Sequence, residues 1–294
     1  MAIGDQIVDL AIYLKQAQKL DAVNSVMDMG DQDLNLNYDQ LQKKLGHLKI
    51  PEFETLFDRA KYYPERPRVS SSTFWQCLGI KETDRLDLFQ LDRENDVKHI
   101  FYKIDLNYRL EKKVINKKYD LVTDVGNNEH PFNVAECFRS LHNLTNKNGL
   151  MLIQQSIFKG NGLYNFEIGF FESLAAANNY QILYSSYTVS YNNTYFSLPI
   201  TTNILDIINI GAANTISVIY LFKKIDDDNF NYSYQDLGKE PTREEFFTNS
   251  LNFENLPPQR NYVPTNIEHL SIKKMIGVIL KKIKKRYLNK WRKI

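Results

Sequence analysis

Apolar residues recur along this chain with two spacings, and the alternation between them predicts an α/β fold. Helical spacing, three or four residues apart, predicts amphipathic helices over about 4–20, 72–78, 134–144 and 166–178. Short apolar runs bounded by turn residues predict strands over 24–30, 97–106, 119–125 and 150–154. Another short strand is predicted to end at 86–88. Strands that alternate with helices build a mostly parallel sheet with helices on both faces.

The later part of the chain departs from this alternation. Runs rich in β-formers over 181–190 and 215–223 suit an antiparallel pair that closes one edge of the sheet. The long, aromatic and weakly patterned stretch over 191–213 is typical of a lid or a substrate-side insertion. A second insertion, rich in Tyr, Pro and charge, is expected over about 38–70. We therefore predict one domain over 1–225, built on a Rossmann-like, doubly wound sheet of seven strands with an antiparallel edge.

Length and composition exclude several classes of protein. A chain of 294 residues can bury one large α/β core with additions. Cys77 and Cys137 lie far apart and belong to no ligand spacing, so we expect neither a disulfide framework nor a metal site. The first residues lack the basic start of a signal peptide, and no apolar run reaches the length of a membrane span. We therefore expect a cytoplasmic protein.

The charge is distributed unevenly behind a net value of +2. Residues 269–294 hold ten Lys and Arg and no Asp or Glu, and apolar residues fall on one face of a helix there. An acidic and polar connection over 226–268 precedes this segment. A basic amphipathic helix that carries Trp suits an anionic membrane surface at the inner face, and docking on the acidic body of its own or a neighbouring subunit suits it equally. Nucleic-acid binding is disfavoured, because the body offers no second basic patch.

Ionisable side chains cluster where the predicted strand 119–125 ends, at Glu129 and His130. In open α/β sheets, ligands bind at the carboxyl ends of the strands. Acidic or amide groups stand at the ends of four successive strands, which favours a nucleoside over a dinucleotide led by a pyrophosphate. These groups are Asp28 to Asp33, Asp87, Asp105 to Asn107, and Asn127 to His130.

In their order and spacing, these groups resemble the class I S-adenosylmethionine-dependent methyltransferases, in particular a bacterial branch met in surface-polysaccharide gene clusters. The resemblance covers about residues 20–185. It implies a first motif at Asp28-Met-Gly30 followed by Gln32 and Asp33, with a glycine that lets the backbone approach the methionine moiety. The second and third glycines of the commoner motif are missing. It also implies that Asp87 accepts from the ribose hydroxyls, and that Asp105 and Leu106 meet the adenine.

The resemblance further assigns the acceptor side of the site. The segment from Asn127 to Asn133 is similar to the one that faces both the sulfonium and the methyl acceptor in such enzymes. The segment 162–171 is similar to the one whose aromatic residues line the acceptor side. The family implies S-adenosylmethionine as cofactor. The acceptor would be a small hydroxyl-rich molecule, such as a nucleotide- or lipid-linked sugar, methylated on O or N.

His130 is the candidate general base. Methyl transfer to oxygen or nitrogen needs alignment and the removal of a proton from the acceptor, and an imidazole titrates close to neutral pH. Glu129 would orient the imidazole or anchor a substrate hydroxyl. The alternative is that His130 supports the following helix while Glu129 is solvated.

Two other functions remain open on the sequence. A Rossmann-type nucleotide-sugar enzyme shares the fold class, although no GxGxxG is present. A catalytically inactive scaffold with the methyltransferase fold would use its basic segment to reach a membrane or a partner.

Overall fold

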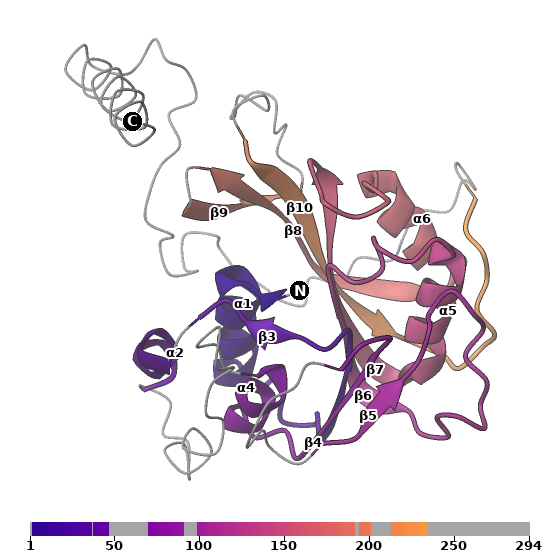
Figure 1. Ribbon diagram of the computed structural model, residues 1–294, viewed down its shortest axis with the longest axis horizontal. Helices are drawn as coiled ribbons and strands as arrows, with labels where there is room; N and C mark the ends of the chain where they lie inside the picture. Colours follow the sequence, from indigo (N-terminus) through magenta and orange to yellow (C-terminus); the bar gives the residue numbers. More distant parts are fainter. Residues whose placement is uncertain are drawn as a thin grey trace, which may run out of the picture.

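An eight-stranded mixed sheet forms the centre of the protein (Figure 1). The computed structural model describes residues 2–36, 38–46, 70–90, 99–191, 194–200 and 213–234. Strand order is β5-β4-β2-β6-β7-β10-β8-β9. The first five are parallel, whereas β10 runs antiparallel to both its neighbours and β9 runs antiparallel to β8. The strands are β2 (Ser25–Met29), β4 (Glu82–Asp87), β5 (Phe101–Lys103), β6 (Tyr119–Val125), β7 (Thr145–Phe158), β8 (Tyr180–Tyr191), β9 (Thr194–Pro199) and β10 (Thr215–Lys224).

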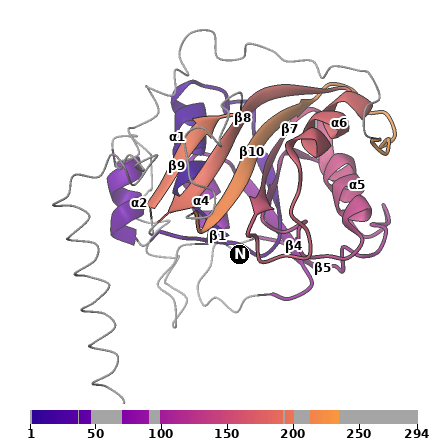
Figure 2. The ribbon, with the colours of Figure 1, turned by 90° about the horizontal axis from the view of Figure 1, so that it is seen from above.

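Helices cover both faces of this sheet (Figures 1 and 2). One face packs against α1 (Asp5–Gln16) and α4 (Ser71–Cys77), and the other against α5 (Val134–Leu144) and α6 (Ile168–Ala177). A short helix, α2 (Tyr38–Leu45), and a two-stranded pairing of β1 (Ala2–Ile3) with β3 (Asp33–Leu34) complete the described elements. Because both faces are covered, every residue of β2 is buried.

The predicted parallel core and its flanking helices are confirmed, but the sheet has eight strands rather than seven. The runs 181–190 and 215–223 do pair antiparallel, as β8 and β10. Within this pair, β10 is the inner strand and lies between β7 and β8. Residues 218–222 of β10 are buried without alternation, as expected of a strand that is covered on both faces. The additional strand is β9, in the stretch predicted to be a lid, and it takes the edge beside β8.

Two strand boundaries also differ from the prediction. The third strand is β5, only three residues long, where 97–106 was expected. The fifth begins at Thr145 instead of residue 150. Residues 146–149 form no separate turn between the helix and the strand, because they lie within β7. They form an irregularity in the pairing with β6, in which Tyr119 opposes Thr145 and Leu121 opposes Leu150.

Several predicted segments lie outside the described residues. These are most of the insertion over 38–70, the part of the expected lid over 201–212, most of the connection over 226–268, and the basic segment over 269–294. Within the part of the chain that is described, no helix has the length and apolarity needed to cross a bilayer. The described His, Cys, Asp and Glu side chains form no group of three that could hold a metal ion.

Candidate functional site

The strand order places a topological switch point between β2 and β6. From β2 the chain continues to β4 and β5 on one side, and then returns to β6 and β7 on the other. In doubly wound sheets, a ligand crevice lies at the carboxyl ends of the strands beside such a point. A crevice is therefore expected at this point, and we use the name switch crevice for the residues that end or follow β2, β4, β5 and β6. All four predicted strand-end groups belong to it.

Buried side chains, instead of the further glycines of the commoner motif, fix the loop after β2. Gly30 adopts a φ of 102°, and its amide donates to the carbonyl of Leu86 on β4 over 2.7 Å. Asp31 turns its carboxylate inward to a buried ion pair with Arg85, 2.7 Å apart. The Gln32 side chain, also fully buried, donates to the carbonyls of Met29 and Val125 and so spans the switch point. These contacts fix the glycine-poor loop.

Asp28 and Asp33 are both buried, the first in β2 and the second in β3. The carboxylate of Asp28 is fully buried and accepts hydrogen bonds from Trp75 Nε1 at 3.1 Å and from the Thr123 hydroxyl. Burial raises the pKa of Asp28. Asp33 is buried in β3, where it forms a bridge with Ser70. Asp28 is therefore a buried group inside the sheet, and Asp33 is buried in the strand that follows the β2 loop, so neither is among the partly exposed carboxylates.

Asp87 and Asp105 stand at the crevice and are partly exposed. Asp87 ends β4, and its two oxygens accept from the amides of Asp31, at 2.8 Å, and Phe89, at 3.2 Å. Asp105 follows β5 and accepts with Oδ1 from the amide and the side chain of Asn107, both at 2.9 Å. A carboxylate oxygen can accept more than one hydrogen bond, so both groups keep acceptor capacity for a ligand. The adjacent Leu106 is buried.

The turn after β6 is organised by Asp124, which is buried inside the strand. Its carboxylate accepts from the amides of Asn127 and Asn128, at 3.3 and 3.1 Å, and from Gln155 Nε2 at 2.6 Å. Burial, with the nearby Glu129 carboxylate adding to it, raises the pKa of Asp124 to about 7 against these hydrogen bonds. The Asn127 side chain is buried and contacts that of Asn128. Asp124 therefore sets the backbone from which the next residues reach the crevice.

Glu129 and His130 come together at this turn. Glu129 is buried, and its Oε2 accepts from the amide of Ser156 at 2.9 Å. The carbonyl of Glu129 accepts from the amides after Gly162, and a Cβ on Gly162 would lie 2.5 Å from that carbonyl oxygen, so only glycine permits the approach. The side chain of His130 is 37% exposed, and its Nε2 lies 4.0 Å from Glu129 Oε1. The carboxylate is thus fixed and the imidazole faces solvent beside it.

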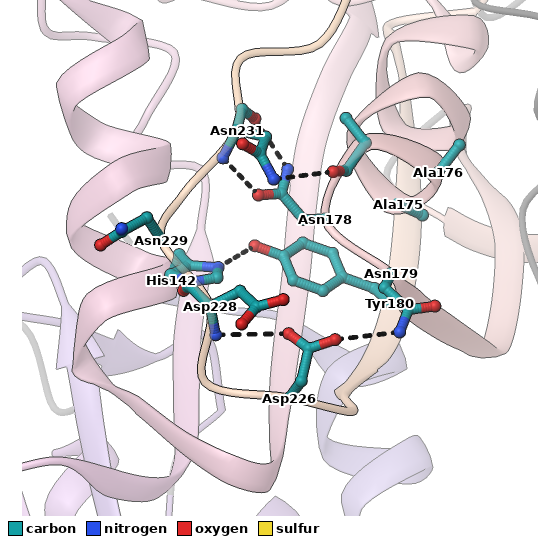
Figure 3. A pocket seen from close by; sticks show the side chains of 11 residues that line it. His142, Ala175, Ala176, Asn178, Asn179, Tyr180, Asp226, Asp228, Asn229 and Asn231 are labelled. Carbon is teal, nitrogen blue, oxygen red and sulfur yellow. Dashed lines mark hydrogen bonds between the residues drawn. The ribbon is translucent and has the colours of Figure 1, made fainter.

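A second polar cluster lies at the other end of the strands, near the starts of β7 and β8, around a cavity of about 520 Å³ (Figure 3). We call it the strap pocket, because residues 225–234 cross it after β10. His142 on α5 is bonded through Nδ1 to the Tyr180 hydroxyl, 2.6 Å away, and through Nε2 to the Asp228 carbonyl, 2.8 Å away. Asn178 and Asn231 exchange hydrogen bonds of 2.8 and 2.9 Å. These groups bond to one another and tie the strap to the helices, so this cavity is a structural feature of the fold.

Sequence reasoning missed three residues that shape the crevice, Arg85, Asp124 and Gln155, and it gave no partner for Asp31. Arg85 and Asp124 stand inside predicted strands, where a buried charge is rare unless it is paired. That rarity was the available signal. It indicates that such a residue has a partner, but it does not name the partner.

Comparison with solved structures returns methyltransferases with low similarity. No family model and no curated protein matches the chain. A 1,6-didemethyltoxoflavin-N1-methyltransferase from Burkholderia thailandensis, with bound 1,6-didemethyltoxoflavin and S-adenosylhomocysteine, is 12% identical over 76% of this chain and 80% of its own, with a TM-score of 0.40. An S-adenosylmethionine-dependent methyltransferase from Clostridium acetobutylicum is 13% identical over 73% and 90%, with a TM-score of 0.31. At this level the likeness carries no conclusion about function, which rests on the residues of the crevice.

Proposed function

We propose that the protein is an S-adenosylmethionine-dependent methyltransferase that acts on oxygen or nitrogen of a small acceptor. The observation that carries the proposal is the placement of carboxylates on both sides of one switch point. Asp87 and Asp105 lie on one side, and Glu129 with His130 lies on the other. A nucleoside needs acceptors for its hydroxyls and amine, and a methyl acceptor needs a base, so the two halves of the crevice suit the two substrates.

The residues of the first half fit the nucleoside part of the cofactor. We assign the ribose hydroxyls to Asp87 and the adenine to Asp105 and the backbone of Leu106. Gly30 would let the chain approach the methionine moiety, and Asn127 would border it from β6. Asp28, Gln32 and Asp33 would act on the cofactor through the loop that they hold. When bound, S-adenosylmethionine supplies a methyl group on a sulfonium, which needs no further activation.

The second half fits the acceptor. Glu129 is pinned by the Ser156 amide and can hold a substrate hydroxyl or turn the imidazole of His130. His130 is exposed enough to take the proton from the attacking oxygen or nitrogen. The resemblance to enzymes of surface-polysaccharide clusters favours a sugar acceptor, carried on a nucleotide or a lipid.

Calorimetry tests the cofactor assignment. The full-length protein should bind both S-adenosylmethionine and S-adenosylhomocysteine, and Asp105→Ala should weaken both at least tenfold. Absence of binding to either ligand would refute the methyltransferase function and leave the inactive scaffold. Binding of NAD in their place would favour a nucleotide-sugar enzyme. Once an acceptor is found, His130→Ala should lower kcat by about 10² to 10⁴ with unchanged cofactor affinity.

The basic segment over 269–294 is proposed to bring the enzyme to an anionic membrane surface or to a protein partner. It lies outside the described residues, and its charge pattern alone supports this role. Full-length protein should sediment with vesicles that contain phosphatidylglycerol. Replacing its lysines by glutamine should abolish that sedimentation, and sedimentation that persists would exclude the segment as the anchor.

A further inference from the structure

Three large apolar side chains stand in solvent on the loops that follow strands of the switch crevice. Tyr108 is 72% exposed, Phe132 is 79% exposed and Leu163 is 65% exposed. They belong to the loops that follow β5, β6 and β7, three strand ends of the same edge of the sheet. We call these three residues the apolar rim. Scattered exposed apolar residues need no explanation, but a group on linked loops beside a site marks a binding surface.

Hydrogen bonds link the three loops to one another. The amide and side chain of Asn133, next to Phe132, donate to the side chain and backbone oxygens of Asn107, next to Tyr108. The Tyr164 hydroxyl, next to Leu163, donates to the carbonyl of Phe132 at 2.5 Å. None of these bonds uses a rim side chain. The loops are therefore held together independently of the residues that they expose.

The same loops are fixed to the acceptor half of the crevice. The amides of Leu163 and Tyr164 donate to the carbonyl of Glu129, at 2.7 and 3.2 Å. The close approach requires Gly162, where a side chain would collide with Glu129. Phe132 follows His130 by two residues in the chain. The apolar rim therefore lies on loops that are bonded to the backbone of Glu129 and that begin, for Phe132, two residues after His130.

We propose that the apolar rim binds an apolar portion of the methyl acceptor, so that the acceptor is amphipathic: a hydroxyl- or amine-bearing head at Glu129 and His130, joined to an aliphatic or aromatic group. This inference rests on the proposed function for the identity of the head. It selects, among sugar-like acceptors, those linked to a lipid or an aromatic group over free sugars and nucleotide-linked sugars, whose remaining surface is polar.

The test compares hexyl β-D-glucoside with methyl β-D-glucoside, which share the hydroxyl-bearing ring and differ in apolar length. Binding to the full-length protein is measured by saturation-transfer NMR in the presence of S-adenosylhomocysteine. We expect hexyl glucoside to bind at least fivefold more tightly. The triple variant Tyr108→Ser, Phe132→Ser, Leu163→Ser should remove that preference. Equal binding of the two glucosides to the wild type, including no binding of either, would overturn the proposal.

A matched control separates the rim from apolar surface in general. Ile100 is 52% exposed at the amino end of β5, the opposite edge of the sheet, and Ile100→Ser should keep the preference. Loss of the preference in this control as well would also overturn the proposal. The proposed function is tested separately, by calorimetry of the same wild-type protein. If that function is wrong, S-adenosylhomocysteine will not bind.

Discussion

The switch crevice and the strap pocket are both polar, but their titratable groups are perturbed in opposite directions. In the crevice, burial raises the pKa of the Asp124 carboxyl to about 7. In the strap pocket, burial and the nearby Lys224 ammonium lower the pKa of His142 to about 4. Both shifts favour the neutral form of a buried group. Acid therefore stabilises the fold at one end of the sheet and destabilises it at the other.

The partners of these groups explain why one cluster is structural and the other is a candidate site. In the strap pocket, His142 Nε2 carries the proton, because the Asp228 carbonyl can only accept, and Nδ1 accepts from Tyr180. Each ring nitrogen is thus used inside the protein. In the crevice, Asp124 uses its hydrogen bonds to hold a turn whose last residue, His130, faces solvent. The buried group supports an exposed one.

The largest effect is expected from Asp124→Asn, which imitates the neutral acid. The folded pKa lies above the unfolded value of 3.8, so wild-type stability falls as pH rises from about 4 to 7. At 1.36 kcal/mol per unit, the cost at pH 8 is on the order of 4 kcal/mol. The variant should be more stable than the wild type at pH 8 and similar to it at pH 4. Urea unfolding followed by the fluorescence of buried Trp75 measures the difference.

The rearrangement that Asp124→Asn needs is small. Gln155 Oε1 is buried with no hydrogen-bond partner among the described residues, so a flipped Gln155 can accept from the new amide. The turn amides keep an acceptor oxygen. If wild type and variant show the same pH dependence of unfolding between pH 4 and 8, Asp124 is not the group that titrates and the contrast between the two clusters fails.

The next effect is expected from His142→Ala in the strap pocket. It removes two hydrogen bonds and the ring contacts with Tyr180 and Phe230. The Tyr180 hydroxyl is left buried, so at pH 8 the free energy of unfolding should fall by about 3 kcal/mol. The folded pKa of His142 is lowered, so its contribution is present above pH 6.5 and is lost as pH falls through 4. The cost of the substitution should shrink accordingly.

Asn229→Ala is the matched control for His142→Ala, since Asn229 is an exposed residue of the same strap. It should change stability by less than about 0.5 kcal/mol. Both strap variants should bind S-adenosylhomocysteine as the wild type does. Weakened binding in His142→Ala at a temperature where it is folded would mean that the strap pocket is coupled to the crevice.

The two ends of the sheet also differ in how far the sequence predicts them. Strand ends are local patterns, so Asp87, Asp105 and Glu129 could be placed at one edge from apolar runs and the turn residues after them. The five parallel strands and both helical layers follow from the same alternation. The strap pocket could not be predicted, because it joins His142 on α5 to residue 228, 86 positions later, beyond any predicted element.

Pairings between strands that are distant in the sequence could not be predicted for the same reason. Asp31 and Arg85 are 54 residues apart and meet because β2 and β4 are neighbours in a particular register. The place of β10 between β7 and β8 is likewise a matter of which distant strands pair, and the pattern within residues 215–224 does not name them. Periodicity reports which residues are buried, but it carries no information about the strand that lies alongside.

The smallest effect on stability, with the clearest effect on ligand binding, is expected from Asp87→Asn. The amide oxygen of the variant can accept from Asp31, while the exposed amide of Phe89 loses its acceptor and turns to water, so the free energy of unfolding should change by about 1 kcal/mol or less. Hydrogen bonds from ribose hydroxyls to a charged acceptor are worth about 1.5 to 3 kcal/mol, so affinity for S-adenosylhomocysteine should fall roughly 10- to 100-fold. Calorimetry at pH 7.5 measures it.

Glu82→Gln tests whether that loss of affinity belongs to the carboxyl edge. Glu82 is a carboxylate on the same strand as Asp87, at its amino end, where it pairs with Lys117 on the surface. Removing its charge costs little, because an exposed ion pair is screened by solvent. Affinity for S-adenosylhomocysteine should be unchanged. Equal affinity in Asp87→Asn and Glu82→Gln would remove Asp87 from the site, whereas loss in the first alone assigns ligand binding to the carboxyl end of β4.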